Sequence, residues 1–130
     1  MEKTTICMLI DDDDDEHEIF REALSQTLLP VRCLFAFNCP TAIKLISSDE
    51  KSIPEFIFMD WNLGGIQGMD CLNQLNRVIP DNCQLIVYSG LISQQTLDEL
   101  KQYNYHFFQK TGSIKLLAKE LKLIFETASA

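Results

Sequence analysis

The chain has 130 residues, 46% of them hydrophobic and 23% charged, which is enough apolar material for one globular domain with its own core. Nineteen acidic residues against eleven basic ones give a formal net charge of −8, which argues against direct binding to nucleic acid or to an anionic membrane. No apolar run approaches the roughly 20 residues of a membrane-spanning helix, and the first residues do not resemble a secretory signal, so we expect a cytoplasmic protein.

The first part of the chain alternates between apolar runs and segments with helical spacing. Ile6–Ile10 predicts a strand, and the apolar positions from Ile19 to Leu28 predict a helix that ends at Pro30. Cys33–Phe37 predicts a second strand, and a shorter helix follows it after Pro40. The strands are almost continuously apolar rather than alternating, which is typical of strands covered on both faces.

The same alternation continues to the last predicted helix. Strands are predicted at Phe56–Met59, Leu85–Tyr88 and Tyr105–Phe108, and helices from Met69 to Ile79, from Leu91 to Tyr103 and from Ile114 to Phe125. Pro80 ends the first of these helices, and Ser93 is the expected N-cap of the second.

Five strand–helix units in strict alternation predict an α/β fold. The expected architecture is a five-stranded parallel sheet with helices on both faces, built from residues 1–130 as one domain. In such open sheets, ligands bind beyond the carboxyl ends of the strands, at a topological switch point. The residues that end each strand are therefore the candidates for a functional site.

Charged and polar residues follow four of the five predicted strands. Asp11 and Asp12 follow the first strand, Asp60 the third, Ser89 the fourth and Lys110 the fifth. Three carboxylates that meet at one edge would repel one another unless a cation lay among them, and oxygen ligands in a small site suit Mg²⁺. A carboxylate can also accept a phosphoryl group, whose other oxygens a hydroxyl and an ammonium can bind.

The other conspicuous polar residues have ordinary structural explanations. Acidic residues from Asp13 to Glu16 stand at the start of a predicted helix, where the helix dipole stabilises them by roughly 0.3–1 kcal/mol each. His17 and His106 have no partner at a spacing that suggests catalysis, so we expect both to be surface or packing residues.

The five cysteines are expected to be reduced. They are Cys7, Cys33, Cys39, Cys71 and Cys83. No two have the C-x-x-C spacing, and the chain has only two histidines, which argues against a zinc site. An odd number of cysteines without a signal peptide is typical of cytosolic thiols.

In these features the chain resembles, from end to end, a response-regulator receiver domain of two-component signalling. The resemblance rests on the order and spacing of Asp11, Asp12, Asp60, Gly68, Ser89 and Lys110. It implies a flavodoxin-like, doubly wound (βα)5 fold and a stand-alone regulator similar to chemotaxis regulators, without a separate output domain. It also implies a phospho-acceptor that is not an enzyme beyond its own phosphorylation and dephosphorylation.

The resemblance further implies a role for each residue of the acidic edge. Asp60 accepts a phosphoryl group from the phosphohistidine of a sensor histidine kinase or of a phosphotransfer protein. Asp12, Asp60 and the backbone carbonyl of Asn62 bind Mg²⁺ directly, and Asp11 holds it through water.

The remaining implied roles concern the response to phosphorylation. Ser89 and Lys110 bind phosphoryl oxygens, and Phe107 occupies the position of a rotating switch aromatic. Movement of Ser89 and Phe107 remodels the face made by the fourth helix, the fifth strand and the fifth helix. A downstream protein of unknown identity reads that face, or the phosphoryl group passes onward in a phosphorelay, from a monomer or a weak homodimer.

The sequence departs from the family pattern in three places. Thr111 follows Lys110 where the family usually has a proline with a cis bond, and a cis bond without proline costs about 2.5–4 kcal/mol. This leaves the Lys110–Thr111 bond open, cis or trans with a rearranged loop. Gly64 and Gly65 replace a frequent proline and give their loop more freedom, and the bulky Trp61 could screen the pocket.

Two other functions stay open on the sequence alone. A receiver-like protein-binding module with a vestigial pocket would have the same fold without phosphorylation. A small Mg²⁺-dependent phosphatase similar to the haloacid dehalogenases would use Asp11 and Asp13, but no further acidic pair follows Lys110, and Asp60 would have no role.

Overall fold

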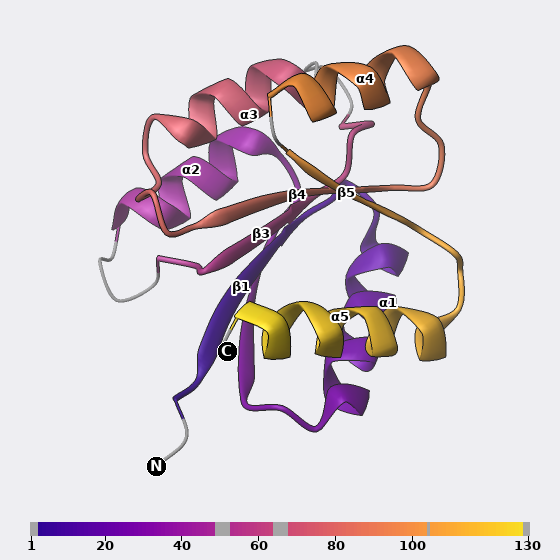
Figure 1. The fold of residues 1–130 in the computed structure, drawn as a ribbon. Coiled ribbons are helices and arrows are strands. Elements are labelled where there is room, and N and C mark those ends of the chain that lie inside the picture. Colours follow the sequence, from indigo (N-terminus) through magenta and orange to yellow (C-terminus); the bar gives the residue numbers. More distant parts are fainter. Residues whose placement is uncertain (1–2, 49–52, 64–67, 104, 129–130) are drawn as a thin grey trace.

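The computed structural model describes residues 3–48, 53–63, 68–103 and 105–128 and contains one parallel sheet. Its strand order is β2-β1-β3-β4-β5, and helices connect the strands (Figure 1). The strands are β1 (Thr5–Ile10), β2 (Val31–Ala36), β3 (Phe56–Met59), β4 (Gln84–Ser89) and β5 (His106–Gln109). The helices are α1 (Asp14–Thr27), α2 (Cys39–Ser48), α3 (Gly68–Asn76), α4 (Gln94–Gln102) and α5 (Ile114–Ala128). The predicted α/β fold is confirmed.

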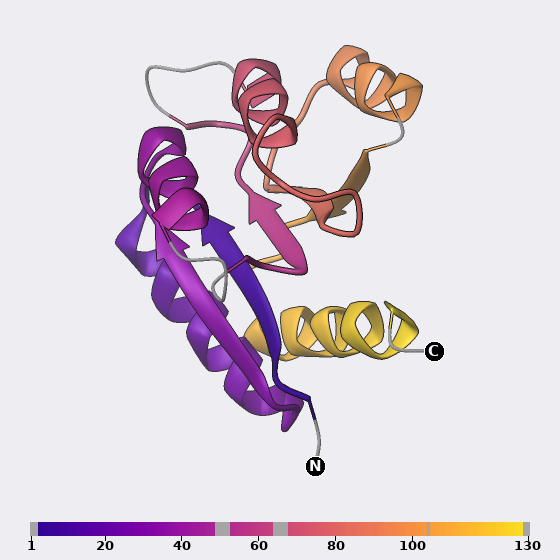
Figure 2. The same cartoon turned by 90° about the vertical axis from the view of Figure 1, so that its left-hand side faces the viewer.

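The helices cover both faces of the sheet and enclose two hydrophobic cores. α1 and α5 lie together on one face, and α2, α3 and α4 lie on the other (Figures 1 and 2). Phe20, Phe58 and Leu121 are fully buried in the core on the α1 side. Met59 and Leu72 are fully buried in the core on the other side. Successive strand residues alternate between the two cores, which explains why the strands are apolar at nearly every position.

The strand register aligns the carboxyl ends of the strands at one edge of the sheet. Ile10, the last residue of β1, pairs with Ala36 of β2 and with Met59 of β3. Met59 pairs in turn with Val87 of β4, two residues before the end of that strand. Residues that directly follow β1 and β3 therefore lie side by side, although about 50 positions separate them in sequence.

Side-chain caps set the start of two helices, and the cap at Ser93 was predicted. The Asp13 carboxylate accepts a hydrogen bond from the Asp15 N–H and caps α1, whose first turn is acidic. The Ser93 hydroxyl accepts one from the Thr96 N–H and caps α4, so that helix begins at Gln94 rather than at the predicted Leu91.

Two further helix bounds differ from the predicted ones. α2 begins at Cys39, so Pro40 lies in its first turn, where a missing N–H costs nothing. α3 ends at Asn76, and the chain makes a separate turn up to Ile79 before Pro80. Within the described residues, no helix is long and apolar enough to cross a membrane.

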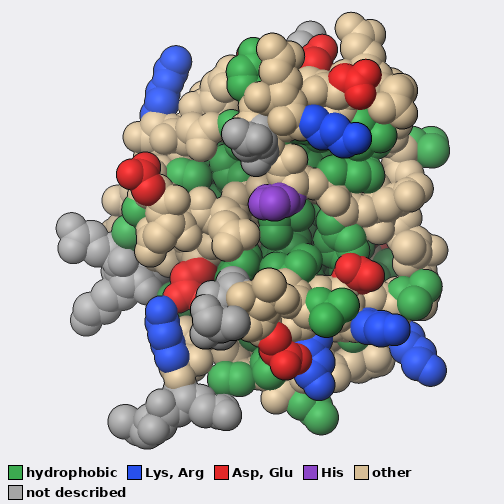
Figure 3. Space-filling view, in the orientation of Figure 1, with side chains coloured by type: hydrophobic (Ala, Val, Ile, Leu, Met, Phe, Trp, Pro, Cys, Tyr) green, Lys and Arg blue, Asp and Glu red, His purple; other side chains and the backbone are tan. Residues whose placement is uncertain are grey.

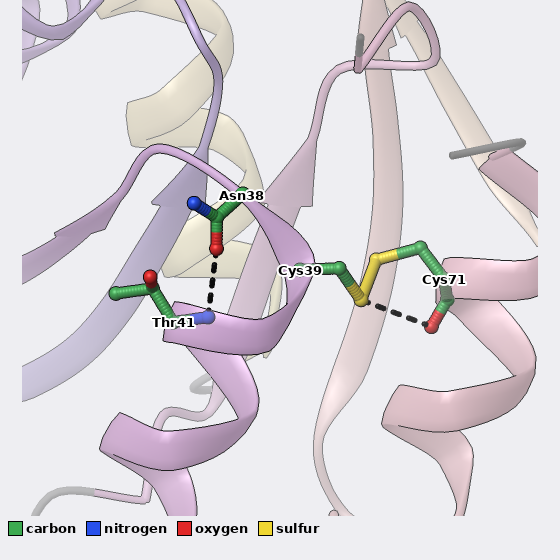
Figure 4. Close-up of a disulfide and its surroundings, with 4 residues drawn as sticks. All are labelled: Asn38, Cys39, Thr41 and Cys71. Atoms are coloured by element: carbon green, nitrogen blue, oxygen red, sulfur yellow. Dashed lines mark hydrogen bonds between the residues drawn. A yellow bond between two sulfur atoms is a disulfide. The ribbon is translucent and has the colours of Figure 1, made fainter. Parts of the chain in front are cut away.

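The expectation that all cysteines are reduced is wrong for one pair. Cys39 at the start of α2 and Cys71 in α3 form a disulfide between two fully buried residues (Figure 4). Their Cα atoms are 5.9 Å apart because the two helices pack side by side on one face of the sheet. Cys7, Cys33 and Cys83 are free, and Cys7 and Cys83 are buried as expected.

Candidate functional site

Three carboxylates converge at the carboxyl edge of the sheet. Asp11, Asp12 and Asp60 each place one carboxylate oxygen within 4.8 Å of the others. Asp11 is fully buried and Asp60 is 7% exposed, whereas Asp12 faces solvent. The sheet ladder fixes the first and third, because the Asp11 N–H donates to the Ala36 carbonyl (3.0 Å) and the Asp60 N–H to the Ile10 carbonyl (2.9 Å). The predicted convergence of these three residues is confirmed.

Lys110 reaches into this cluster from the end of β5. Its Nζ lies 2.8 Å from Asp11 Oδ2, 3.3 Å from Asp60 Oδ2 and 3.8 Å from Glu16 Oε2. Its backbone N–H donates to the Ser89 carbonyl (3.0 Å), which anchors the lysine to the end of β4. One ammonium faces several carboxylates, so the cluster keeps a net negative charge that a second cation can neutralise.

The pKa values of the buried pair reflect this arrangement. Burial raises the pKa of the Asp11 carboxyl, although the Lys110 ammonium and the hydrogen bond from the Asp13 N–H oppose the shift. Burial alone would lower the pKa of the Lys110 ammonium. Its pKa is nevertheless raised, because the ammonium forms a hydrogen bond with Asp11 and is attracted by the charges of Asp11, Asp60 and Glu16. Any cation that approaches Asp11 favours its ionised form, so the site is electrostatically suited to a metal ion.

Ser89 contacts the third carboxylate from the end of β4. Its hydroxyl is fully buried and donates to Asp60 Oδ1 (3.1 Å), with the Leu91 carbonyl as a second acceptor at 3.4 Å. The Asn62 N–H also donates to Asp60 Oδ1 (3.2 Å). One oxygen of Asp60 therefore faces the hydroxyl and the other faces Lys110. The metal-binding role predicted for the Asn62 carbonyl stays a prediction.

The loop after Lys110 keeps the lysine in reach of the cluster without a proline. The described residues contain no cis peptide bond, so the Lys110–Thr111 bond is trans. Gly112 follows with a φ of 79°, a left-handed conformation that glycine adopts without strain. Lys110 still contacts both Asp11 and Asp60. Gly64 and Gly65, the other expected departure, lie outside the described residues.

Phe107 lies in β5 and lines a hollow on the molecular surface. It is half-buried and packs against the core under α2, α3 and α4, whereas Phe108 stacks on Tyr88 in the opposite core. This hollow of about 500 Å³ is bounded by β4, β5 and α5. Figure 3 shows hydrophobic side chains in the hollowed part of this face. The rotation predicted for Phe107 stays a prediction.

The two histidines have different environments. His106 is exposed on β5, as expected of a surface residue. His17 is a packing residue, 4% exposed, and its ring also forms a hydrogen bond with the backbone of Asp11. Its spacing from Phe20 and Leu24 places it on the buried face of α1, but no sequence pattern indicated the bond to Asp11.

Trp61 packs against the start of α3. A Cβ atom added to Gly68 would lie only 2.5–2.8 Å from three atoms of the Trp61 ring system, which is closer than real side chains approach. Trp61 is also in contact with the core under α2 and α3. Glycine at position 68 therefore permits the indole next to Asp60 to occupy its place.

The effect of replacing Gly68 with alanine is expected to depend on Trp61. In the wild type, the added methyl group should displace the indole and destabilise the protein by about 1–3 kcal/mol. In a Trp61→Ala background the same change should have little effect on stability, since the methyl group then has space and Gly68 is the first residue of α3, not an interior one. Urea denaturation of the four proteins measures this, and a loss of equal size in both backgrounds would contradict the contact.

A model of the response regulator receiver domain matches residues 7–122 of the chain. No curated protein matches the sequence. The fold is similar to that of the phosphorylated cyanobacterial phytochrome response regulator RcpA, with a TM-score of 0.80, 18% identity and coverage of 98% of this chain and 96% of that one.

Two other solved structures have the same fold. One is the signal receiver domain of a putative LuxO repressor protein from Vibrio parahaemolyticus (TM-score 0.78, 19% identity, 98% of this chain and 94% of that one). The other is the Mn²⁺-bound response regulator Rcp1 (TM-score 0.73, 16% identity, 92% and 91%). Since the family model spans most of the sequence and the strand ends carry the residues that the resemblance requires, this chain belongs to the response regulator receiver domain family.

Proposed function

We propose that this receiver domain is a phosphoryl-accepting switch in which Asp60 takes a phosphoryl group from a phosphohistidine in a Mg²⁺-dependent reaction. The observation that carries the proposal is the meeting of Asp11, Asp12 and Asp60 within 4.8 Å of one another, with Lys110 and Ser89 in contact with Asp60. The donor is a sensor histidine kinase or a histidine phosphotransfer protein.

The carboxylate oxygens of Asp11, Asp12 and Asp60 form a donor set that fits Mg²⁺. Bound there, Mg²⁺ would neutralise charge on the phosphoryl oxygens during in-line transfer. In the transfer, the bond between phosphorus and the imidazole nitrogen breaks and a bond to a carboxylate oxygen of Asp60 forms. Asp60 is 7% exposed, so little of its surface is open to a donor.

Lys110 and Ser89 have to change partners when Asp60 is modified. The Lys110 ammonium, now 3.3 Å from Asp60 Oδ2, pairs with a phosphoryl oxygen. The Ser89 hydroxyl, now bonded to Asp60 Oδ1, turns toward another. Ser89 ends β4, and Phe107, which pairs with Val87 of the same strand, lines the hollow beside α5. Movement of Ser89 would reach the surface that a downstream protein reads through these neighbouring strands.

The phosphatase alternative finds no support in the geometry. Among the described residues, Asp11, Asp12 and Asp60 make up the one group of carboxylates placed to hold a metal ion, and none of its members comes from a segment after Lys110. The alternative of a binding module without phosphorylation has the same geometry, so a chemical test has to separate it from the switch.

Incubation with Mg²⁺ and acetyl phosphate, followed by intact mass measurement, tests the proposal. We expect one phosphate adduct on the wild type and none on Asp60→Asn. Asp81→Asn is the matched control, because Asp81 is exposed just before the start of β4, at the opposite edge of the sheet. An adduct retained on Asp60→Asn would overturn the assignment, and no adduct on any of the three proteins would favour the module without phosphorylation.

A further inference from the structure

The side chain of His17 is bound to the backbone of the acidic cluster. It is 4% exposed, and its Nε2 lies 2.7 Å from the carbonyl oxygen of Asp11, six residues earlier in the chain. A carbonyl oxygen can only accept a hydrogen bond, so Nε2 carries the proton and donates it. The bond joins the first turns of α1 to the end of β1.

Two aromatic rings fix the orientation of this imidazole. The ring of Phe37 stacks on it with centroids 4.4 Å apart, and the ring of Phe35 lies 5.2 Å away on a tilted plane. Both belong to the end of β2 and the residue just beyond it. The imidazole is therefore held between α1 and β2, with little freedom to turn away from Asp11.

His17 completes the set of hydrogen bonds around Asp11. The Asp11 N–H donates to Ala36, its Oδ1 accepts from the Asp13 N–H (3.0 Å), and its Oδ2 accepts from Lys110. The backbone carbonyl is the remaining polar group, and His17 is its partner. Without His17 this carbonyl would lose its hydrogen-bond partner, which is unfavourable for a buried polar group.

The bond to the carbonyl also acts on the next residue. The Asp11 carbonyl belongs to the peptide plane that joins Asp11 to Asp12, so fixing it restricts the backbone on both sides. Asp12 is exposed, and within the described part of the chain no side-chain hydrogen bond orients its carboxylate. The direction of the Asp12 side chain therefore depends on this peptide plane.

We propose that His17 is a positioning residue for the acidic cluster: its Nε2–H fixes the peptide between Asp11 and Asp12 and so aims both carboxylates at one cation. The inference rests on the proposed function, since it requires that the cluster bind Mg²⁺. His17 touches neither the cation nor the phosphoryl group and acts through the two aspartates.

Magnesium binding without any phosphodonor tests the proposal. Trp61 is the single tryptophan and lies beside Asp60, so its fluorescence and isothermal calorimetry both report the binding. His17→Phe keeps an aromatic ring against Phe35 and Phe37 but has no donor, and we expect its Mg²⁺ dissociation constant to rise about tenfold. His17→Gln keeps an N–H at similar reach and should stay within about threefold of the wild type. His106→Gln is the control at an exposed histidine and should bind as the wild type does.

The outcomes separate this inference from the proposed function. If the wild type binds no Mg²⁺, the proposed function and the role of His17 are both wrong. If the wild type binds and His17→Phe binds equally well, or His17→Gln loses as much affinity as His17→Phe, only the role of His17 falls.

A second measurement on the wild type covers the case in which His17→Phe does not fold. The chain has two histidines, so ¹⁵N spectra of the imidazoles are simple to assign. We expect His17 to be protonated at Nε2 and its signals to shift during a Mg²⁺ titration, with the same half-saturation as Trp61 fluorescence, while the signals of His106 stay in place. A proton at Nδ1 alone, or no shift of His17 at saturating Mg²⁺, overturns the proposal.

Discussion

Replacing Lys110 with methionine is expected to lower the free energy of unfolding of the metal-free protein by about 3 kcal/mol and to strengthen its binding of Mg²⁺. Lys110 is the cation between Asp11 and Asp60 in the structure, and its side chain is only 14% exposed. Without it, two buried carboxylates face each other unpaired, and losing one partner of a buried pair costs about 3–5 kcal/mol. The methionine keeps an unbranched side chain of similar length but removes the ammonium, which also lies 5.3 Å from the centre of the Tyr88 ring.

The gain in Mg²⁺ affinity follows from the same charges. The ammonium repels a second cation and competes with it for Asp11 Oδ2, so its removal should lower the dissociation constant of Mg²⁺ by about tenfold or more. Urea denaturation with and without Mg²⁺ measures both effects, and Lys119→Met on the exposed side of α5 is the matched control. Weaker Mg²⁺ binding by Lys110→Met would contradict the competition between the ammonium and Mg²⁺ for Asp11.

The ion pairs of Lys110 also predict that the free energy of unfolding depends on pH. The pKa of Lys110 in the folded protein is raised above its ordinary 10.5, so the folded state holds this proton more tightly than the unfolded state. The stabilisation is fully present below pH 10.5 and is lost as the pH rises through the higher pKa of the folded protein. The difference in stability between the wild type and Lys110→Met should therefore shrink above this pH.

The sequence alone predicted the acidic cluster because topology leaves few alternatives. Once the strands are parallel, residues that end or directly follow β1, β3, β4 and β5 must meet at one edge, however far apart they stand in the chain. Asp11, Asp60, Ser89 and Lys110 could thus be named from apolar runs and the residues after them. The trans bond at Thr111 did not remove Lys110 from the cluster.

Contacts made by packing could not be predicted in the same way. The periodicity of α1 places His17 on its buried face, but the choice of the Asp11 carbonyl as partner depends on the angle between α1 and β1. The need for glycine at position 68 depends on where Trp61 packs. Cys39 and Cys71 are 32 positions apart without a motif, and only the packing of α2 beside α3 brings them together.

Reduction of the Cys39–Cys71 disulfide is expected to lower the free energy of unfolding by about 3.5–4 kcal/mol. The bond closes a loop across a sequence separation of 32 residues, and the chain-entropy model assigns a loop of this length that stabilisation. Urea denaturation with and without a dithiol reductant measures the loss. A variant with both Cys39→Ala and Cys71→Ala is the control and should not respond to the reductant.

Counting thiols checks the pairing of Cys39 with Cys71. Closing it removes two electrons and two protons from the two thiols, for which a low-molecular-weight disulfide is a sufficient oxidant. After such oxidation and unfolding, alkylation should modify three cysteines, namely Cys7, Cys33 and Cys83, and it should modify all five after reduction. Five modified cysteines before reduction would contradict the pairing.

The native state is expected to change little when the bond is reduced, because the chain-entropy model places the effect in the unfolded chain. The closed loop contains β3, Asp60 and Trp61, so Trp61 emission is a sensitive report on its native structure. Emission and Mg²⁺ affinity should stay the same before and after reduction while the urea midpoint falls. A shift in emission upon reduction would show instead that the bond shapes the start of α3, where Gly68 meets Trp61 one helical turn before Cys71.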